Sequence, residues 1–173
     1  LEALASQQGH DLTRLSITAM GGASSIGRFL TDALAGGARV AGLCDAGEEP
    51  HVAAAIEGVG LGRVRSRNDL ERLGFFVCEP DLEAELIRAV GVETTLALIA
   101  TQGDDERRFR SMQRQPEWRG RPVEDQLRRW FGSGSGRKMR YASLLGGALN
   151  GADAPRPLKR VVEHAVAFGA TDE

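Results

Sequence analysis

The sequence has 173 residues, a length that suits a single domain with a hydrophobic core of its own. Its 42% hydrophobic and 27% charged residues are ordinary for a soluble globular protein, and no apolar run approaches the roughly 20 residues that a membrane helix requires. These values exclude a membrane-spanning protein. Cys44 and Cys78 lie in apolar runs outside any disulfide framework, which predicts a protein of the reducing cytoplasm.

The first half of the chain alternates between strand-like and helix-like segments. Apolar and β-branched runs predict strands at Arg14–Met20, Arg39–Cys44 and Phe75–Cys78. Helices are predicted between them, over residues 24–34 with a serine N-cap, 51–59, and 68–73 with Asn68 as N-cap. Because helices separate the strands, we expect parallel pairing through right-handed crossovers.

After Asp81 the chain shows helical periodicity and almost no strand signal. We therefore expect an α/β core over residues 1–90, a compact Rossmann-like parallel sheet flanked by helices. A helical extension over residues 91–173 is expected to pack on this core as one compact unit. Leu1 lies inside a helical pattern with no capping residue before it, so we also expect further residues upstream in the natural protein.

Carboxylates follow two of the predicted strands. Asp45 ends the run RVAGLCD and precedes Glu48 and Glu49, and the strand at 75–78 is followed by Glu79, Asp81, Glu83 and Glu85. Ligands of open α/β sheets gather outside the carboxyl ends of the strands, so we expect these acids to converge. Their oxygens suit Mg²⁺ or Mn²⁺. The alternative is that Asp81, Glu83 and Glu85 only complement a helix dipole.

The net charge of −2 hides a basic segment. Residues 107–140 hold eleven Lys or Arg and three acids, a local net charge of +8, which predicts a polyanionic partner such as nucleic acid. The alternative is a solvated face. Trp118, Trp130 and Phe131 lie among these residues, either to stack on bases or to anchor the helices. The predicted nucleic-acid contacts are Arg121, Arg128, Arg129, Arg137, Lys138 and Arg140.

The segment MGGASSIG, residues 20–27, is similar to the TGxxxGxG turn of short-chain dehydrogenases, with Asp45 in the ribose-binding place. Ser25 replaces the middle glycine of that motif. The catalytic Tyr-x-x-x-Lys pair is absent, because Tyr141 is the only tyrosine and Leu145 stands at the lysine position. A nicotinamide-dependent oxidoreductase is therefore the third of three hypotheses.

Five segments together resemble a TOPRIM domain of the OLD-like nuclease branch, a TOPRIM nucleotidyl transferase/hydrolase domain. They are ITAMGGASSIGRFL, VAGLCDAGEE, GFFVCEPDLEAELIRAVG, QRQPEWRGRPVEDQLRRWFG and SGRKMRYASLL. The resemblance places the family's DxD motif on Asp45 and Gly47, its later acid on Glu83, its basic position on Lys138, and its glycine turn on Gly21 and Gly22. The family's first strand, which ends in Val-Glu-Gly with a catalytic glutamate, would stand before Leu1.

What the resemblance implies is Mg²⁺-dependent hydrolysis of a nucleic-acid phosphodiester, or nucleotidyl transfer. Its catalytic residues would be Asp45, Glu83 and Lys138, and its metal ligands Asp45, Glu48, Glu49 and Glu83, with Glu48 or Glu49 replacing the acid that Gly47 lacks. DNA, a second copy of the chain and an ATPase domain are the partners it implies. Gly47 and the missing upstream glutamate favour the second hypothesis, a nucleic-acid-binding module that has lost catalysis.

Overall fold

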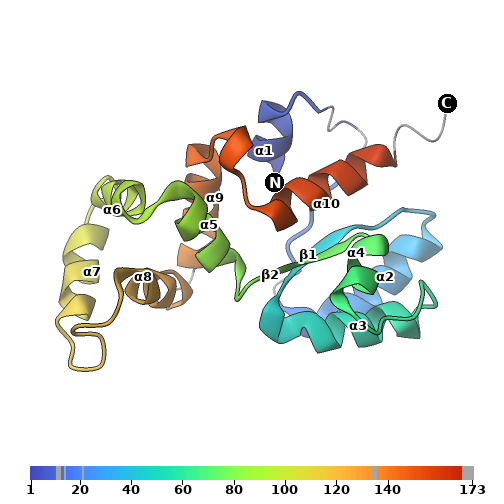
Figure 1. Ribbon diagram of the computed structural model, residues 1–173, viewed down its shortest axis with the longest axis horizontal. Coiled ribbons are helices and arrows are strands. Elements are labelled where there is room, and N and C mark those ends of the chain that lie inside the picture. The colour runs from blue at the N-terminus through green and yellow to red at the C-terminus, as the bar shows by residue number, and fades with distance from the viewer. Residues whose placement is uncertain (11–12, 14, 21, 134–135, 169–173) are drawn as a thin grey trace. The chain divides into compact units, whose positions relative to one another are not determined.

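The computed structural model describes residues 1–10, 13, 15–20, 22–133 and 136–168 (Figure 1). The chain divides into two compact units, Leu1–Leu82 together with Pro155–Glu173, and Glu83–Ala154. The first unit thus ends before the predicted boundary at residue 90, and the last helix returns to it. Each unit is described by itself below.

The first unit is built around a two-stranded parallel sheet. Its strands are β1 (Gly42–Asp45) and β2 (Phe75–Cys78), with Gly42 opposite Phe75 and Asp45 opposite Cys78. Its helices are α1 (Glu2–Gln7), α2 (Ile26–Ala35), α3 (Glu49–Gly58), α4 (Arg67–Arg72) and α10 (Arg156–Ala167). Short 3-10 turns stand at Ala23–Ser25 and Ala46–Glu48. This mixed α/β architecture agrees with the predicted class.

The strand predicted at Arg14–Met20 is wrong. Residues 15–20 have no regular secondary structure, and the sheet of the described residues holds only β1 and β2. Residues 16–19 are exposed, Ile17 with 45% of its surface, so this segment neither pairs its backbone with a strand nor buries an apolar face. The Rossmann-like sheet that was expected is therefore reduced to two strands here.

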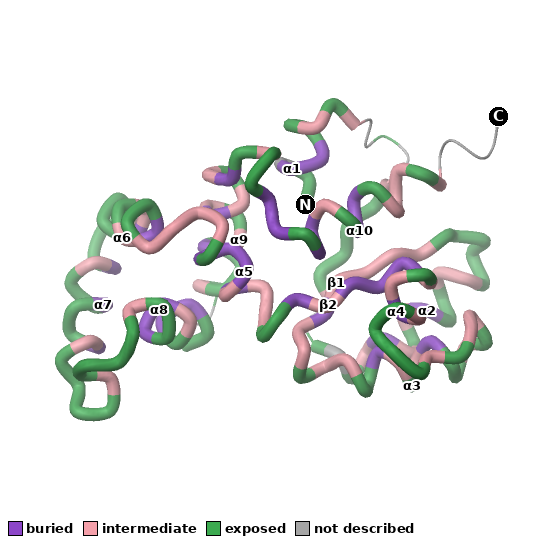
Figure 2. Tube along the Cα trace, in the orientation of Figure 1, coloured by how far each residue is buried: buried purple, intermediate pink, exposed green. Residues whose placement is uncertain are grey.

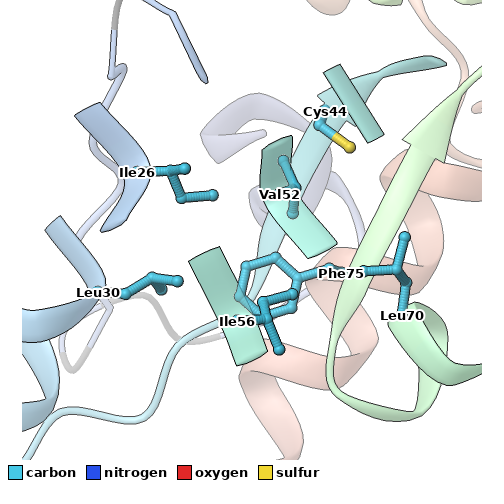
Figure 3. Packing of buried hydrophobic residues seen from close by; sticks show 7 residues of the cluster. All are labelled: Ile26, Leu30, Cys44, Val52, Ile56, Leu70 and Phe75. Atoms are coloured by element: carbon cyan, nitrogen blue, oxygen red, sulfur yellow. The ribbon is translucent and has the colours of Figure 1, made fainter. Parts of the chain in front are cut away.

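Successive strand residues point to opposite sides of the sheet, so apolar side chains emerge on both faces. Helices cover both of these faces (Figure 1). On one face Phe75 packs with α2, α3 and α4 in a cluster shown in Figure 3; its buried members are Ile26, Leu30, Cys44, Val52, Ile56, Leu70 and Phe75. On the other face the ring of Phe76 meets the ring of His164 of α10, with 6.1 Å between centroids. The helix α10 turns Leu158, Val161 and Val162 inward, which explains why it belongs to this unit.

Two local details position the strands. The helix α4 begins after Ser66, whose hydroxyl accepts a hydrogen bond from the N–H of Asp69 at 3.3 Å, and not after the predicted cap Asn68. Gly74, with φ at +86°, then turns the chain into β2 beneath His164. A Cβ atom at this glycine would lie 2.5 Å from Nε2 of His164, so glycine permits both the left-handed turn and the close approach of α10.

The second unit is helical, as the periodicity predicted. It contains α6 (Val92–Ala100), α7 (Asp105–Gln113), α8 (Val123–Gly132) and α9 (Arg137–Ala148), and the helix α5 (Leu82–Val90) leads into it. Its buried aromatic residues include Phe109, Trp130, Phe131 and Tyr141. Figure 2 shows buried and exposed stretches alternating along α7 and α8. Every helix in the part of the chain that the structure describes is too short or too polar to cross a membrane.

Candidate functional site

Asp45 ends β1 and finds its partners in the backbone. Its Oδ1 accepts a hydrogen bond from the N–H of Leu82, the first residue of α5, at 2.9 Å. Asp45 also forms a capping box with Glu48: its side chain accepts from the N–H of Glu48, whose Oε2 lies 3.4 Å from the N of Asp45. A half-buried carboxylate at the end of a strand is thereby stabilised by N–H donors, as a buried charge requires.

The acids that follow the two strands do converge, and Arg67 lies between them. Its Nε donates to Glu49, which follows β1, at 2.9 Å, and its Nη2 donates to Glu79, which follows β2, at 2.6 Å. These hydrogen bonds raise the pKa of Arg67, so the guanidinium keeps its charge. The predicted convergence is therefore confirmed for Glu49 and Glu79, through an arginine that the sequence did not single out.

The pKa of the buried Cys44 thiol is affected by the acids at the end of β1. Burial is the main reason that the pKa of its thiol rises to about 12, and the negative charges of Glu48, Glu49 and Asp45 raise it further, whereas Arg67 acts in the opposite direction. All three carboxylates are thus close enough to act on one buried atom. Three carboxylates therefore gather at the end of β1, with the guanidinium of Arg67 as their counter-charge.

The predicted glycine positions differ in their surroundings. Gly47 lies exposed in the turn after β1, without a positive φ, and a Cβ atom there would meet nothing within 4 Å. A side chain would therefore be tolerated at the position where the family's motif carries its second acid. Gly22 has φ at +143°, which explains a glycine at that turn, whereas Gly21 lies outside the described residues.

Glu83 and Lys138 belong to the second unit, and they are paired there. Glu83 lies in the first turn of α5 and is only 7% exposed, whereas the Lys138 side chain, in the first turn of α9, is 53% exposed. Nζ of Lys138 stands 3.2 Å from Oε1 of Glu83, an ion pair without the alignment of a hydrogen bond. A half-exposed ammonium group thus pairs with a buried carboxylate within the second unit.

Several of the predicted nucleic-acid contacts serve the packing of the second unit. The guanidinium of Arg137 stacks 3.7 Å from the centroid of Trp130 and donates to the carbonyl oxygen of Trp130 at 3.0 Å. Arg140 forms an ion pair with the buried Asp105. Arg121 lies over the ring of Trp118.

The other two predicted contacts lie on α8. Arg128 lies 3.9 Å from Asp125, a long surface ion pair. Arg129 is exposed and makes no side-chain hydrogen bond or ion pair with the described residues.

Comparison of this chain with protein-family models, curated proteins and solved structures finds no match. Its function must therefore be inferred from its own residues.

The carboxylates at the end of β1 are the candidate ligands of a magnesium ion. Within the described residues, no three His, Cys, Asp or Glu side chains are grouped so as to hold a metal by themselves. Mg²⁺ usually binds one or two carboxylates, several waters and a phosphate of its substrate, so a protein cage is not required. Asp45 and Glu48 supply two carboxylates in one turn. Any ion held there would have to bind together with a phosphate, because these two carboxylates also accept backbone N–H bonds.

The sequence did not predict the role of Arg67 or the buried hydrogen bond between Tyr141 and Asp105 in the second unit. Arg67 follows the N-cap Ser66, and its place between Glu49 and Glu79 depends on how α4 packs. In the second unit Asp105 also accepts a hydrogen bond from the hydroxyl of Tyr141 at 2.9 Å. The sequence indicates the pair of Asp105 and Tyr141 only through Asp105, which lies on the same face of its helix as Phe109 and Met112.

Proposed function

We propose that the protein is a Mg²⁺-dependent nucleic-acid phosphodiesterase or nucleotidyl transferase of the TOPRIM type, acting on DNA. The observation that supports it best is the group of carboxylates Asp45, Glu48 and Glu49 at the carboxyl end of β1, where ligands of parallel sheets bind. Glu83 and Lys138, which are paired within the second unit, would be the later acid and the basic position that the resemblance implies.

Asp45 and Glu48 would hold the ion, together with the phosphate of the nucleic acid. The bound ion lowers the pKa of a water and neutralises charge on the phosphoryl oxygens. Arg67 balances Glu49 and Glu79, which limits the negative charge that a phosphate meets at the end of the sheet. Lys138, whose ammonium group pairs with Glu83, would donate to a non-bridging or leaving oxygen of a phosphate.

A nucleic-acid-binding module without catalysis is the second candidate. It is favoured by the partners of the acids, since Asp45 accepts the N–H of Leu82 and Glu49 is bound by Arg67. In this reading the carboxylates have structural roles and the basic helices alone provide the activity. The two candidates predict the same binding and differ in cleavage.

The deciding experiment measures cleavage and ion binding by the purified chain. Plasmid and labelled oligonucleotides are incubated with Mg²⁺, Mn²⁺ or EDTA, and Mn²⁺ binding is followed separately by electron paramagnetic resonance. We expect metal-dependent cleavage that Asp45→Asn abolishes, together with weaker Mn²⁺ binding. The control Asp32→Asn, on the exposed side of α2, removes one carboxylate elsewhere in the same unit. Cleavage retained by Asp45→Asn would overturn the assignment, and binding without any cleavage would establish the second candidate.

A further inference from the structure

The helix α7 has two opposite faces. Asp105, Phe109 and Met112 are its buried residues, at positions i, i+4 and i+7. At 100° per residue, Arg107, Arg110 and Arg114 fall on the other side of this helix, also spaced by three and four residues. All three arginines are exposed, and with Glu106 they line a surface hollow of about 240 Å³. We call these three residues the α7 arginine row.

Packing accounts for the inner face of α7 but not for the row. Arg107 pairs with Asp104 at 3.0 Å, and Arg110 pairs with Glu106; all four side chains are at least 43% exposed. Exposed pairs of this kind are weak and are screened by salt, so a phosphate can compete with the acids for these guanidinium groups. Arg114 makes no side-chain hydrogen bond or ion pair with the described residues.

The loop that follows the row is held in place from within the unit. The buried side-chain amide of Gln126 donates to the carbonyl oxygens of Trp118 and Arg121, at 2.9 and 3.1 Å. The guanidinium of Arg119 donates to the carbonyl oxygen of Arg114 at 3.2 Å, which ties this loop to the end of α7. Trp118 is thereby fixed beyond the last arginine of the row, with part of its surface exposed.

We propose that the α7 arginine row binds the phosphate backbone of a nucleic acid. This inference deepens the proposed function, on which it rests, by assigning its strand-binding surface to three residues of the basic segment that are not among the six predicted contacts. Three guanidinium groups spread over about 10 Å of helix match a continuous chain of phosphates, each of which accepts paired N–H bonds. The partly exposed ring of Trp118, with Arg121 over it, lies beyond the row, and a base that stacked on this ring would favour nucleic acid over an acidic protein.

The test compares Arg107→Gln, Arg110→Gln and Arg114→Gln combined in one chain with a control that carries Arg63→Gln and Arg65→Gln. The control arginines are also exposed but lie in the first unit. Binding of a fluorescein-labelled oligonucleotide is followed by anisotropy over a series of salt concentrations, always in EDTA. Because each phosphate contact contributes about 0.7–0.9 to the salt slope, the triple variant is expected to lower that slope by about 2–3, and the control to leave it unchanged.

Three results would overturn the inference: no binding by the native chain, an unchanged salt slope in the triple variant, or displacement of the oligonucleotide by polyglutamate as readily as by unlabelled oligonucleotide. The triple variant is checked by circular dichroism, and because its changes are on the surface it is expected to keep its helix content. The assay detects binding without metal, so it is independent of cleavage. A chain that binds through the row but never cleaves would refute the proposed catalysis and leave this inference standing.

Discussion

Replacing Asp45 with alanine is expected to destabilise the first unit by about 2–3 kcal/mol. Loss of the capping side chain at the turn after β1 costs about 1 kcal/mol, and leaving the N–H of Leu82 without its acceptor costs about 1–2 kcal/mol more. Asp45→Asn keeps an acceptor oxygen, so its cost is about 1 kcal/mol or less. If Asp45 were only a metal ligand, its removal from beside Glu48 and Glu49 would relieve repulsion and stabilise the metal-free protein.

The measurement is urea unfolding in EDTA followed by far-ultraviolet circular dichroism, because both tryptophans, Trp118 and Trp130, lie in the second unit. Hydrogen exchange at the amide of Leu82 provides a local readout, and its protection is expected to fall in the alanine variant. Asp32→Asn serves as the control for loss of one surface charge. A free energy of unfolding within about 0.5 kcal/mol of the native value for Asp45→Ala would refute the capping role, since that is the range of neutral surface changes.

Three further predictions concern buried groups. Gly74→Ala is expected to lower the free energy of unfolding by about 2–3 kcal/mol, because the φ of +86° strains an alanine and the new Cβ atom meets the His164 ring. Urea unfolding followed by circular dichroism measures this loss, and a loss below about 1 kcal/mol would contradict the prediction. Tyr141→Phe is expected to cost about 1.5–3 kcal/mol through the lost hydrogen bond to the buried carboxylate of Asp105, seen as a shift in unfolding by tryptophan fluorescence; unchanged unfolding would show that this bond contributes nothing. The pKa of the Cys44 thiol is about 12 in the folded state, against an ordinary value of 9.0, so the folded protein binds this proton more tightly. Stability therefore falls as pH rises from about 9 toward 12. At pH 9 iodoacetamide should modify Cys44 only after unfolding in urea, and mass spectrometry locates the modification.

The predictions for β2 and for residues 14–20 show where sequence patterns are sufficient. The run FFVC at 75–78 is almost wholly apolar, so burial in a sheet was its only stable outcome, and the structure has this strand with the predicted bounds. Residues 15–20 carry similar apolar and β-branched side chains but have no strand partner among the described residues. A strand needs a neighbouring strand to pair with, and the residues of a segment do not specify whether such a neighbour exists.

The same distinction applies to the candidate site. The acids after β1 and β2 were predicted from their positions behind apolar runs, and Glu49 and Glu79 do meet. Their meeting point at Arg67 was not predicted, because it depends on the packing of α4 against β2. The place of α10 was missed for a related reason. Its apolar face indicates burial, but the sheet it covers lies about 80 residues earlier in the chain.

The sequence by itself determined the mixed α/β class of the first half, the helical second half, the strand at 75–78 and the acidic and basic segments. These follow from periodicity, apolar runs and charge, which act over a few neighbouring residues. Only the tertiary structure decided that the sheet of the described residues has two strands, and that Asp45 accepts the N–H of Leu82. It also decided that Arg137 and Arg140 serve packing, whereas the α7 arginine row faces outward. Those outcomes depend on which distant groups share a hydrogen bond or an apolar surface, and that is settled when the elements pack.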